Sequence, residues 1–358
     1  MQRSRAAILP FPGDPYLLHY WLGLYARFWS EEIDHLYIYL NSPIESAMVE
    51  YIKQTIDYLN PSGKIIFIYD PVQMEHGAVI NKALDLVLED YIMLIEDDGF
   101  IFKPGIVDWC FEKLESGQYD IVGSKRGSCA MEILTRAQQL WGLSYEGEGD
   151  HGPNFWPCYF FTRKETLLRT DRNFGARAWK RGETIASLDN YTVQGDVIAG
   201  DTFVDASLQL RAMIPKERIL CIPQYHGHPD DLDHFATHYK YSMFGGEASW
   251  CHIGSLSSGV GGLLRDEVDR PLTRRLIDPP GNPTRLPTQW CQSDFEKREF
   301  ERRVTMWLMF WEHSDPNINQ EFNILYKNAV YRIIEQYGLS WTAIQRRKEI
   351  FEKLFSKQ

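Results

Sequence analysis

The sequence predicts an α/β fold in which a mostly parallel sheet is flanked by helices and followed by a helical extension. Strand-like and helix-like segments alternate through the first 125 residues, a pattern typical of βαβ units. An uninterrupted apolar run at 91–95 indicates a strand that is buried on both faces. Beyond Ser293, the apolar residues recur at helical spacing only.

Each element of the first half has its own signal. Apolar runs that end at proline- or glycine-containing turns predict strands at 6–9, 35–40, 64–69, 90–95 and 119–123. Apolar residues at helical spacing predict helices at 16–29, 44–59 and 76–88.

The second half is less regular. We expect an aromatic strand within 154–161, a short helix from Arg163, long loops over 171–200, a helix at 201–213 and a strand at 219–222. Irregular chain at 223–262 and a linker at 279–287 follow, and then helices at 293–312, 318–336 and 340–356.

The bulk composition excludes several classes of protein. A net charge of −11 argues against a general basic surface that would bind nucleic acid. No apolar run is long enough to span a membrane, and the N-terminal apolar run is too short for a signal peptide. The 6 cysteines are widely spaced, without a C-x-x-C pair, which predicts reduced thiols in a cytoplasmic protein.

Three consecutive carboxylates, Glu96, Asp97 and Asp98, directly follow the buried strand 91–95. Like charges repel, so their burial requires a compensating cation or hydrogen-bond donors. In open α/β sheets, ligands bind just beyond the carboxyl ends of the strands. The triplet therefore predicts Mn²⁺ or Mg²⁺ holding a phosphate-bearing ligand. The alternative interpretation is a solvated acidic turn.

The order of these elements resembles a known group. With His76-Gly77, Asn81-Lys82-Ala83, the acidic triplet and Pro104-Gly105, the chain resembles the nucleotide-sugar-binding half of GT-A glycosyltransferases of the family 2 type. The triplet is similar to the D-x-D motif of that fold. The resemblance covers about residues 6–262 and implies a GT-A catalytic domain at 1–278. The helical tail has no counterpart in it, and the helical spacing there predicts a separate helical subdomain at 288–358. Within the catalytic domain, 1–125 would bind the nucleotide sugar and 126–278 the acceptor.

The resemblance also implies roles for single residues. Asp98 would bind the metal that bridges the two phosphates of the donor, and Glu96 or Asp97 would face its ribose or sugar. The remaining donor contacts would come from the first turn and the end of the third strand, through Pro10, Asp14 and Asp70. Five basic residues are candidate contacts of the diphosphate or of the acceptor: Lys125, Arg126, Arg177, Lys180 and Arg181. A turn-forming Asp-Pro at Asp70 and a solvated basic loop at Lys125 and Arg126 are the alternatives.

On the acceptor side, Gly200-Asp201 resembles the element that supplies the catalytic base in inverting enzymes of this fold. Asp201 is the first candidate and Asp205 the second, while a plain helix N-cap is the alternative for Asp201. A late histidine often completes the metal shell in such enzymes, which makes His226, His228 or His252 candidate ligands. Structural histidines are the alternative.

The chain is therefore expected to be a metal-dependent glycosyltransferase that moves a sugar from a nucleotide-diphosphate donor to a hydroxyl, with inversion. The expected acceptor is a glycan or a lipid-linked glycan. A hydroxymethylated base in DNA is less favoured because of the negative charge. A non-catalytic sugar-nucleotide-binding protein is the rival from another class. A pyrophosphorylase is disfavoured because the first turn, 10–14, lacks a glycine-rich loop containing arginine.

Overall fold

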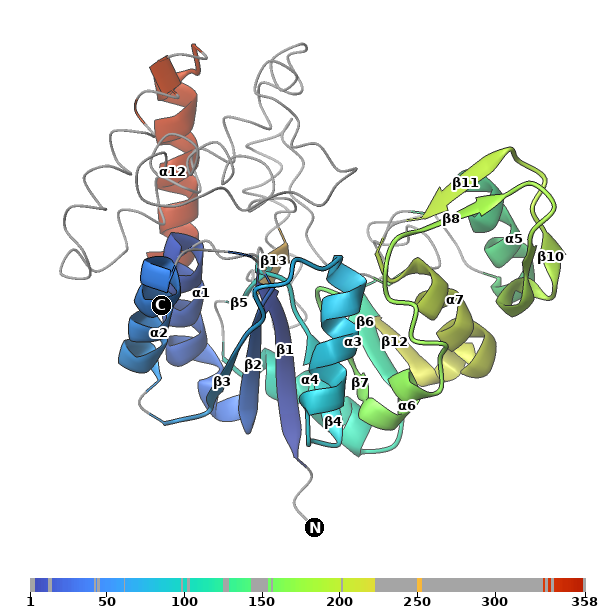
Figure 1. Cartoon of the computed structure of the whole chain (residues 1–358), viewed down its shortest axis with the longest axis horizontal. Coiled ribbons are helices and arrows are strands. Elements are labelled where there is room, and N and C mark those ends of the chain that lie inside the picture. Colours follow the sequence, from blue (N-terminus) through green and yellow to red (C-terminus); the bar gives the residue numbers. More distant parts are fainter. Residues whose placement is uncertain are drawn as a thin grey trace.

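The computed structural model describes residues 4–11, 15–41, 43, 46–60, 62–97, 99–101, 104–124, 129–142, 154–155, 157–200, 202–222, 250–252, 331, 334–335 and 338–356. Within these residues, helices surround a central sheet, and a smaller region of short strands lies to one side of it (Figure 1).

The first half alternates strand and helix as predicted. Its elements are β1 (Arg5–Phe11), α1 (Pro15–Phe28), η1 (Ser30–Glu32), β2 (His35–Leu40), α2 (Ser46–Leu59), β3 (Ile65–Tyr69), α3 (His76–Leu86), β4 (Tyr91–Leu94), β5 (Gly99–Ile101), α4 (Ile106–Glu115) and β6 (Ile121–Ser124). The predicted strands and helices of this half agree with the structure to within a few residues, whereas β5 and α4 lacked a prediction.

The second half contributes α5 (Met131–Trp141), β7 (Phe160–Arg163), α6 (Lys164–Leu168), β8 (Arg177–Lys180), β9 (Thr184–Ile185), η2 (Ala186–Leu188), β10 (Tyr191–Thr192), β11 (Val197–Gly200), α7 (Val204–Met213), η3 (Lys216–Arg218), β12 (Ile219–Ile222), β13 (Trp250–His252) and α12 (Trp341–Ser356). The strand predicted at 219–222 and the short helix after Arg163 are confirmed.

The main sheet has seven strands in the order β12-β6-β7-β4-β1-β2-β3. All pairings are parallel except those of β7, which runs antiparallel between β4 and β6. The predicted class, a mixed α/β fold with a mostly parallel sheet flanked by helices, is confirmed. Because β4 pairs on both sides and lies under helices, its side chains are apolar without alternation.

Both faces of the sheet are covered, as adjacent residues of β7 illustrate. Phe160 packs edge-on against Phe203, just before α7, with ring centroids 5.0 Å apart. Phe161 points to the opposite face and packs against Phe111 of α4 at 5.2 Å. Successive side chains of a strand point to opposite faces, so α7 and α4 cover different sides of the sheet.

The prediction of long loops over 171–200 is wrong in part. Two small antiparallel ribbons occupy much of this segment, β8 with β11 and β9 with β10. Their strands are only 2 to 4 residues long, which is too short for a periodic pattern to appear in the sequence. Trp179 and Ile185 anchor them to a second apolar cluster with α5 and α7.

The helix predicted at 201–213 begins later, at Val204, with Phe203 at its N-cap in a left-handed conformation. Asp201 itself lies outside the described residues. Near the C-terminus, α12 confirms the helix predicted at 340–356. The helix predicted at 293–312 lies outside the described residues, as does most of that at 318–336, and a separate subdomain at 288–358 stays a prediction.

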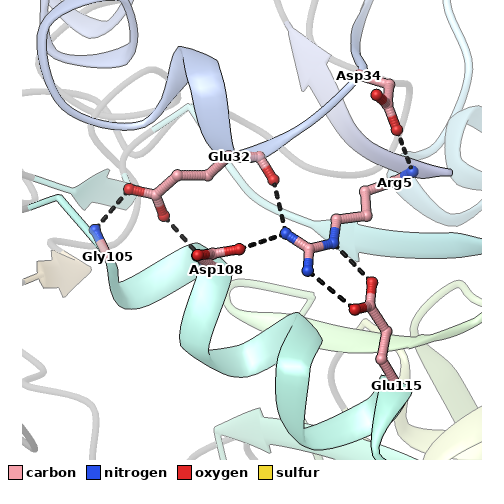
Figure 2. Close-up of polar contacts among 6 residues, drawn as sticks. All are labelled: Arg5, Glu32, Asp34, Gly105, Asp108 and Glu115. Atoms are coloured by element: carbon pink, nitrogen blue, oxygen red, sulfur yellow. Dashed lines mark hydrogen bonds and ion pairs between the residues drawn. The ribbon is translucent and has the colours of Figure 1, made fainter. Parts of the chain in front are cut away.

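A polar network holds α4 to the amino end of β1 (Figure 2). The guanidinium of Arg5 donates two hydrogen bonds to Glu115, at 2.7 and 3.0 Å, and a third to Asp108. Glu32 accepts from the backbone N–H groups of Gly105 and Asp108, which caps the first turn of α4. Burial raises the pKa of Glu32, and these backbone hydrogen bonds oppose the rise.

Among the described residues, no helix is long and apolar enough to cross a membrane. Cys110, Cys129, Cys158 and Cys221 are free thiols. This agrees with the prediction of reduced thiols for those four positions.

Candidate functional site

The carboxyl ends of four neighbouring parallel strands form one edge of the sheet. In the register, Pro10 of β1 lies opposite Tyr39 of β2, and the last residue of β2 lies opposite Tyr69 of β3. The segment after β4 continues the same edge, because the Ile95 N–H donates to the carbonyl of Ile8 at 3.1 Å. We call this side, which includes Pro10, Asp70, Glu96 and Asp97, the donor edge.

Two residues of the acidic triplet are described. The Glu96 side chain is 20% exposed, and its Oε1 lies 3.7 Å from Nδ1 of His76, the first residue of α3. The distance suits an ion pair when the imidazole is protonated and exceeds that of a hydrogen bond. Asp97 is buried, and Asp98 lies outside the described residues. Two adjacent acids at the end of a buried strand are thus placed as the sequence predicted.

A strand that the sequence did not predict brings distant chain to this point. β5 begins at Gly99, directly after the triplet, and pairs antiparallel with β13, so that His252 lies opposite Gly99. The backbone of His252, one of the predicted metal ligands, is therefore next to the acidic triplet. β5 escaped prediction because it has three residues, which is too short for a periodic pattern.

Close packing explains why Gly99 follows the acids. A Cβ at this position would collide with the sulfur of Cys158. The carbonyl of Gly99 accepts a buried hydrogen bond from the Trp21 indole at 2.8 Å. The chain after the triplet is therefore fixed from two sides.

Asp70, after β3, is held by several donors. Lys82 of α3 lies 2.9 Å from its Oδ2, and the Tyr39 hydroxyl donates to the same oxygen at 3.2 Å. The hydrogen bond from Lys82 is the main reason why the pKa of Asp70 is lowered. Its Oδ1 accepts the N–H of Val72 at 3.0 Å, which is the turn geometry of the alternative interpretation. Asp70 therefore forms the turn and also presents a fixed Lys–Asp–Tyr cluster.

The start of α3 touches the second half of the chain. A Cβ on Gly77 would collide with the backbone of Phe174 and Gly175. Glu75, at the N-cap of α3, accepts the N–H of Ala176 at 3.1 Å. His76 follows Glu75 in the chain and faces Glu96, so Glu75 and His76 connect the segment 174–176 with the donor edge.

Asp205, the second candidate for the base, lies in the first turn of α7 and is buried. Its Oδ2 accepts from Arg177 at 2.9 Å and from the Asn173 amide at 3.0 Å. Burial raises the pKa of the Asp205 carboxyl, and the charge of Arg177 opposes that rise. The sequence did not indicate that Asp205 would be committed to an ion pair.

The other predicted site residues cannot be placed. Those outside the described residues are Asp14, Asp98, Lys125, Arg126, Asp201, His226 and His228. Of the predicted set, the structure brings together Pro10, Asp70, Glu96 and Asp97 on the donor edge, with the backbone of His252 beside them.

The carboxylates at the donor edge are suitable ligands for a hard divalent cation. Carboxylate oxygens are the ligands that Mg²⁺ and Mn²⁺ prefer. Within the described ranges, which exclude Asp98, no three acidic, histidine or cysteine side chains gather as a ready-made cage. Mg²⁺ in phosphate-transfer sites typically uses one or two carboxylates and completes its shell with water and substrate phosphates, so a full protein cage is not required.

No protein-family model matches the chain, and no curated relative matches it by sequence. Among solved structures, it is similar to glucosyl-3-phosphoglycerate synthase from Mycobacterium tuberculosis, at TM-score 0.34 and 16% identity over 47% of this chain and 60% of that one. A complex of that synthase with Mn²⁺, UDP-glucose and phosphoglyceric acid matches at TM-score 0.34 and 16% identity, over 47% and 59%.

The chain is also similar to 4-diphosphocytidyl-2C-methyl-D-erythritol synthase from Anaerococcus prevotii, at TM-score 0.33 and 10% identity over 62% of this chain and 86% of that one. The match with the mycobacterial synthase spans about three-fifths of the length of that protein. At these TM-scores and identities, the similarity assigns no activity and no residue role.

Proposed function

We propose that the chain is a metal-dependent glycosyltransferase that moves a sugar from a nucleotide-diphosphate donor to an acceptor hydroxyl, with inversion. The observation that carries this proposal is the donor edge. It places two adjacent acids after a buried parallel strand, next to the backbone of His252 and on the same edge as the Lys82–Asp70–Tyr39 cluster. This is the position at which open α/β sheets bind ligands.

Each part of a donor would find its group there. Asp70, with Lys82 and Tyr39, would bind the base or ribose, against the turn that includes Pro10 and Asp14. Glu96 and Asp97 would face the ribose or the sugar, while Lys125 and Arg126 would contact the diphosphate.

Mn²⁺ or Mg²⁺, when held by Asp98 and one of His226, His228 or His252, would stabilise the charge that develops on the diphosphate.

The acceptor hydroxyl needs a base. When the base removes the hydroxyl proton, the oxygen attacks the anomeric carbon as the bond to the diphosphate breaks. Asp205 is already engaged by Arg177 and Asn173, which favours a structural role for it. We therefore assign the base to Asp201, which is next in sequence to the last residue of β11.

A thermal-shift screen tests the proposal, because a ligand that binds only the native state raises its melting temperature. The probes are sugars linked to the diphosphates of uridine, guanosine, adenosine and thymidine. Each is measured in the presence of Mn²⁺, of Mg²⁺ and of EDTA. At least one should stabilise the chain when a metal is present and not in EDTA. If none does so under any condition, the proposal is wrong.

A further inference from the structure

Arg177, the first residue of β8, is fixed in place while much of its surface stays open to solvent. Its Nη1 donates to Oδ2 of Asp205 at 2.9 Å, and its side chain is 40% exposed whereas that of Asp205 is 8% exposed. Asn173 holds the same carboxylate oxygen from a second direction, at 3.0 Å. The buried acid is thus an anchor for a guanidinium at the surface.

An aromatic ring limits the motion of Arg177 further. Its guanidinium carbon lies 5.6 Å from the ring centroid of Trp179, which is 1% exposed. Guanidinium groups stack on aromatic faces and carry five donors in a planar fork. Within the part of the chain that the structure describes, Asp205 is the carboxylate paired with this fork, and it engages one nitrogen.

Arg177 connects the start of α3 with β11, the strand that precedes the proposed base in the sequence. The preceding residue, Ala176, donates its N–H to Glu75, which adjoins His76 opposite Glu96. On its other side, Arg177 pairs in the ribbon with Gly200, the residue directly before Asp201 in the sequence. A group held by Arg177 would therefore lie beside the strand that leads into Asp201, on the acceptor side.

We infer that Arg177 binds an anionic group, a phosphate or a carboxylate, on the acceptor. The inference rests on the proposed function, because it identifies the class of acceptor for the same site. An anchored and partly exposed guanidinium matches the two oxygens of such a group bidentately. Compensation of the Asp205 charge alone would require only a positive charge, which lysine also supplies.

The experiment measures anion binding by calorimetry in EDTA, so that neither a metal nor a nucleotide takes part. The probes share one three-carbon frame: glycerol 3-phosphate, glycerate and uncharged glycerol. Arg177→Lys keeps the charge beside Asp205 and loses the fork, so the fold should persist. Arg136→Lys is the matched control, because Arg136 also lies over an aromatic ring, at 5.7 Å from Tyr191, and pairs with an aspartate, Asp189, at 3.3 Å.

The native chain should bind at least one of the two anions saturably, and glycerol should give no saturable heat. Arg177→Lys should lose affinity for that anion at least tenfold, whereas Arg136→Lys should retain it. The anion that binds tells a phosphorylated acceptor from a carboxylated one. The melting temperature of each variant shows whether it is folded. If Arg177→Lys does not fold, the double variant Arg177→Gln with Asp205→Asn, which removes both charges of the pair, replaces it.

Three results would overturn the inference: no saturable binding of either anion, equal loss in both lysine variants, or no loss in Arg177→Lys. A fourth would reassign Arg177 to the donor. In that case Arg177→Lys would weaken the metal-dependent binding of UDP and leave the anions unaffected. Since nucleotide-sugar binding with metal is measured separately, the inference can fail while the proposed function stands.

Discussion

The two ends of the parallel strands in the central sheet use acidic residues in different ways. We call the side formed by their amino ends the amino edge, and the side formed by their carboxyl ends is the donor edge. At the amino edge, acids have close partners: Asp108 and Glu115 bind Arg5, buried Glu89 binds His35 and Tyr37, and Asp120 binds Arg218. At the donor edge, Asp70 is likewise paired with Lys82, at 2.9 Å, whereas Glu96 and Asp97 are consecutive and Glu96 lies 3.7 Å from the His76 imidazole.

We propose that the acids of the amino edge hold the fold, whereas the consecutive acids Glu96 and Asp97 belong to the ligand site. Burying a carboxylate costs several kcal/mol unless donors or cations compensate it. The amino edge meets this cost with arginine, tyrosine and histidine side chains of the chain itself. The donor edge concentrates charge at one point, which a divalent ion and the donors of a bound substrate would balance.

The largest expected effect concerns the base. Asp201→Asn should lower the transfer rate by about 10²–10⁴-fold, because asparagine cannot accept the acceptor proton. Nucleotide-sugar affinity should hardly change, since the residue would touch the acceptor only. Steady-state kinetics with calorimetry checks both points, with Asp205→Asn as the comparison. Turnover near that of the native chain would move the base elsewhere, with Asp205 next in line.

At the amino edge, the expected effect is on stability. Arg5→Ala should lower the free energy of unfolding by about 3 kcal/mol, because it removes the guanidinium that pairs with partly buried Glu115 and with Asp108. Arg181→Ala is the matched control, because its pair with Asp196, at 2.9 Å, is exposed on both sides and should contribute less than about 1 kcal/mol. Urea unfolding measures both, and similar losses would contradict the distinction.

The contact between α3 and segment 174–176 gives a smaller effect. Gly77→Ala should cost about 2 kcal/mol of stability, because the new Cβ meets backbone atoms that cannot move aside freely. Gly23→Ala, in α1 where nothing lies within 4 Å, should instead stabilise the chain by up to about 1 kcal/mol. The two changes are compared by thermal unfolding. Equal effects would mean that the contact is not tight.

The smallest effect is on pH dependence. A hydrogen bond from Arg218 lowers the pKa of Asp120. An acid with a lowered pKa in the folded state adds stability above its unfolded pKa of about 4, which is lost as the pH falls through the folded value. The difference in stability between the native chain and Asp120→Asn should therefore be constant from pH 7 to about 4 and shrink below. A difference that persists at pH 2 would contradict the assignment.

Much of the sheet could be predicted from the sequence, because its strands are buried on both faces and end at turns. The run 91–95 and the acids after it needed no tertiary information. Short strands such as β5 and β8 could not be predicted, since pairing with distant chain defines them rather than their own pattern. The antiparallel direction of β7 depends on the same kind of long-range pairing.

The candidate site was predictable only in part, for a similar reason. Asp70 and Glu96 follow strands, so topology alone places them on one edge. The partners of Asp70 come from another strand and a helix, and Asp205 meets Arg177 through a ribbon that the sequence did not indicate. Contacts between residues far apart in the chain left no local signal.

The central claim is that the donor edge binds a nucleotide-diphosphate sugar through a divalent ion. Calorimetry of the best donor from the thermal screen, with Mn²⁺ and then with EDTA, tests it most directly. The native chain should bind with Mn²⁺ only, and Asp98→Ala should remove the binding without unfolding the chain. Asp57→Ala, which removes an exposed acid of α2, should bind as the native chain does. Undiminished affinity in EDTA, or in Asp98→Ala, would contradict the claim.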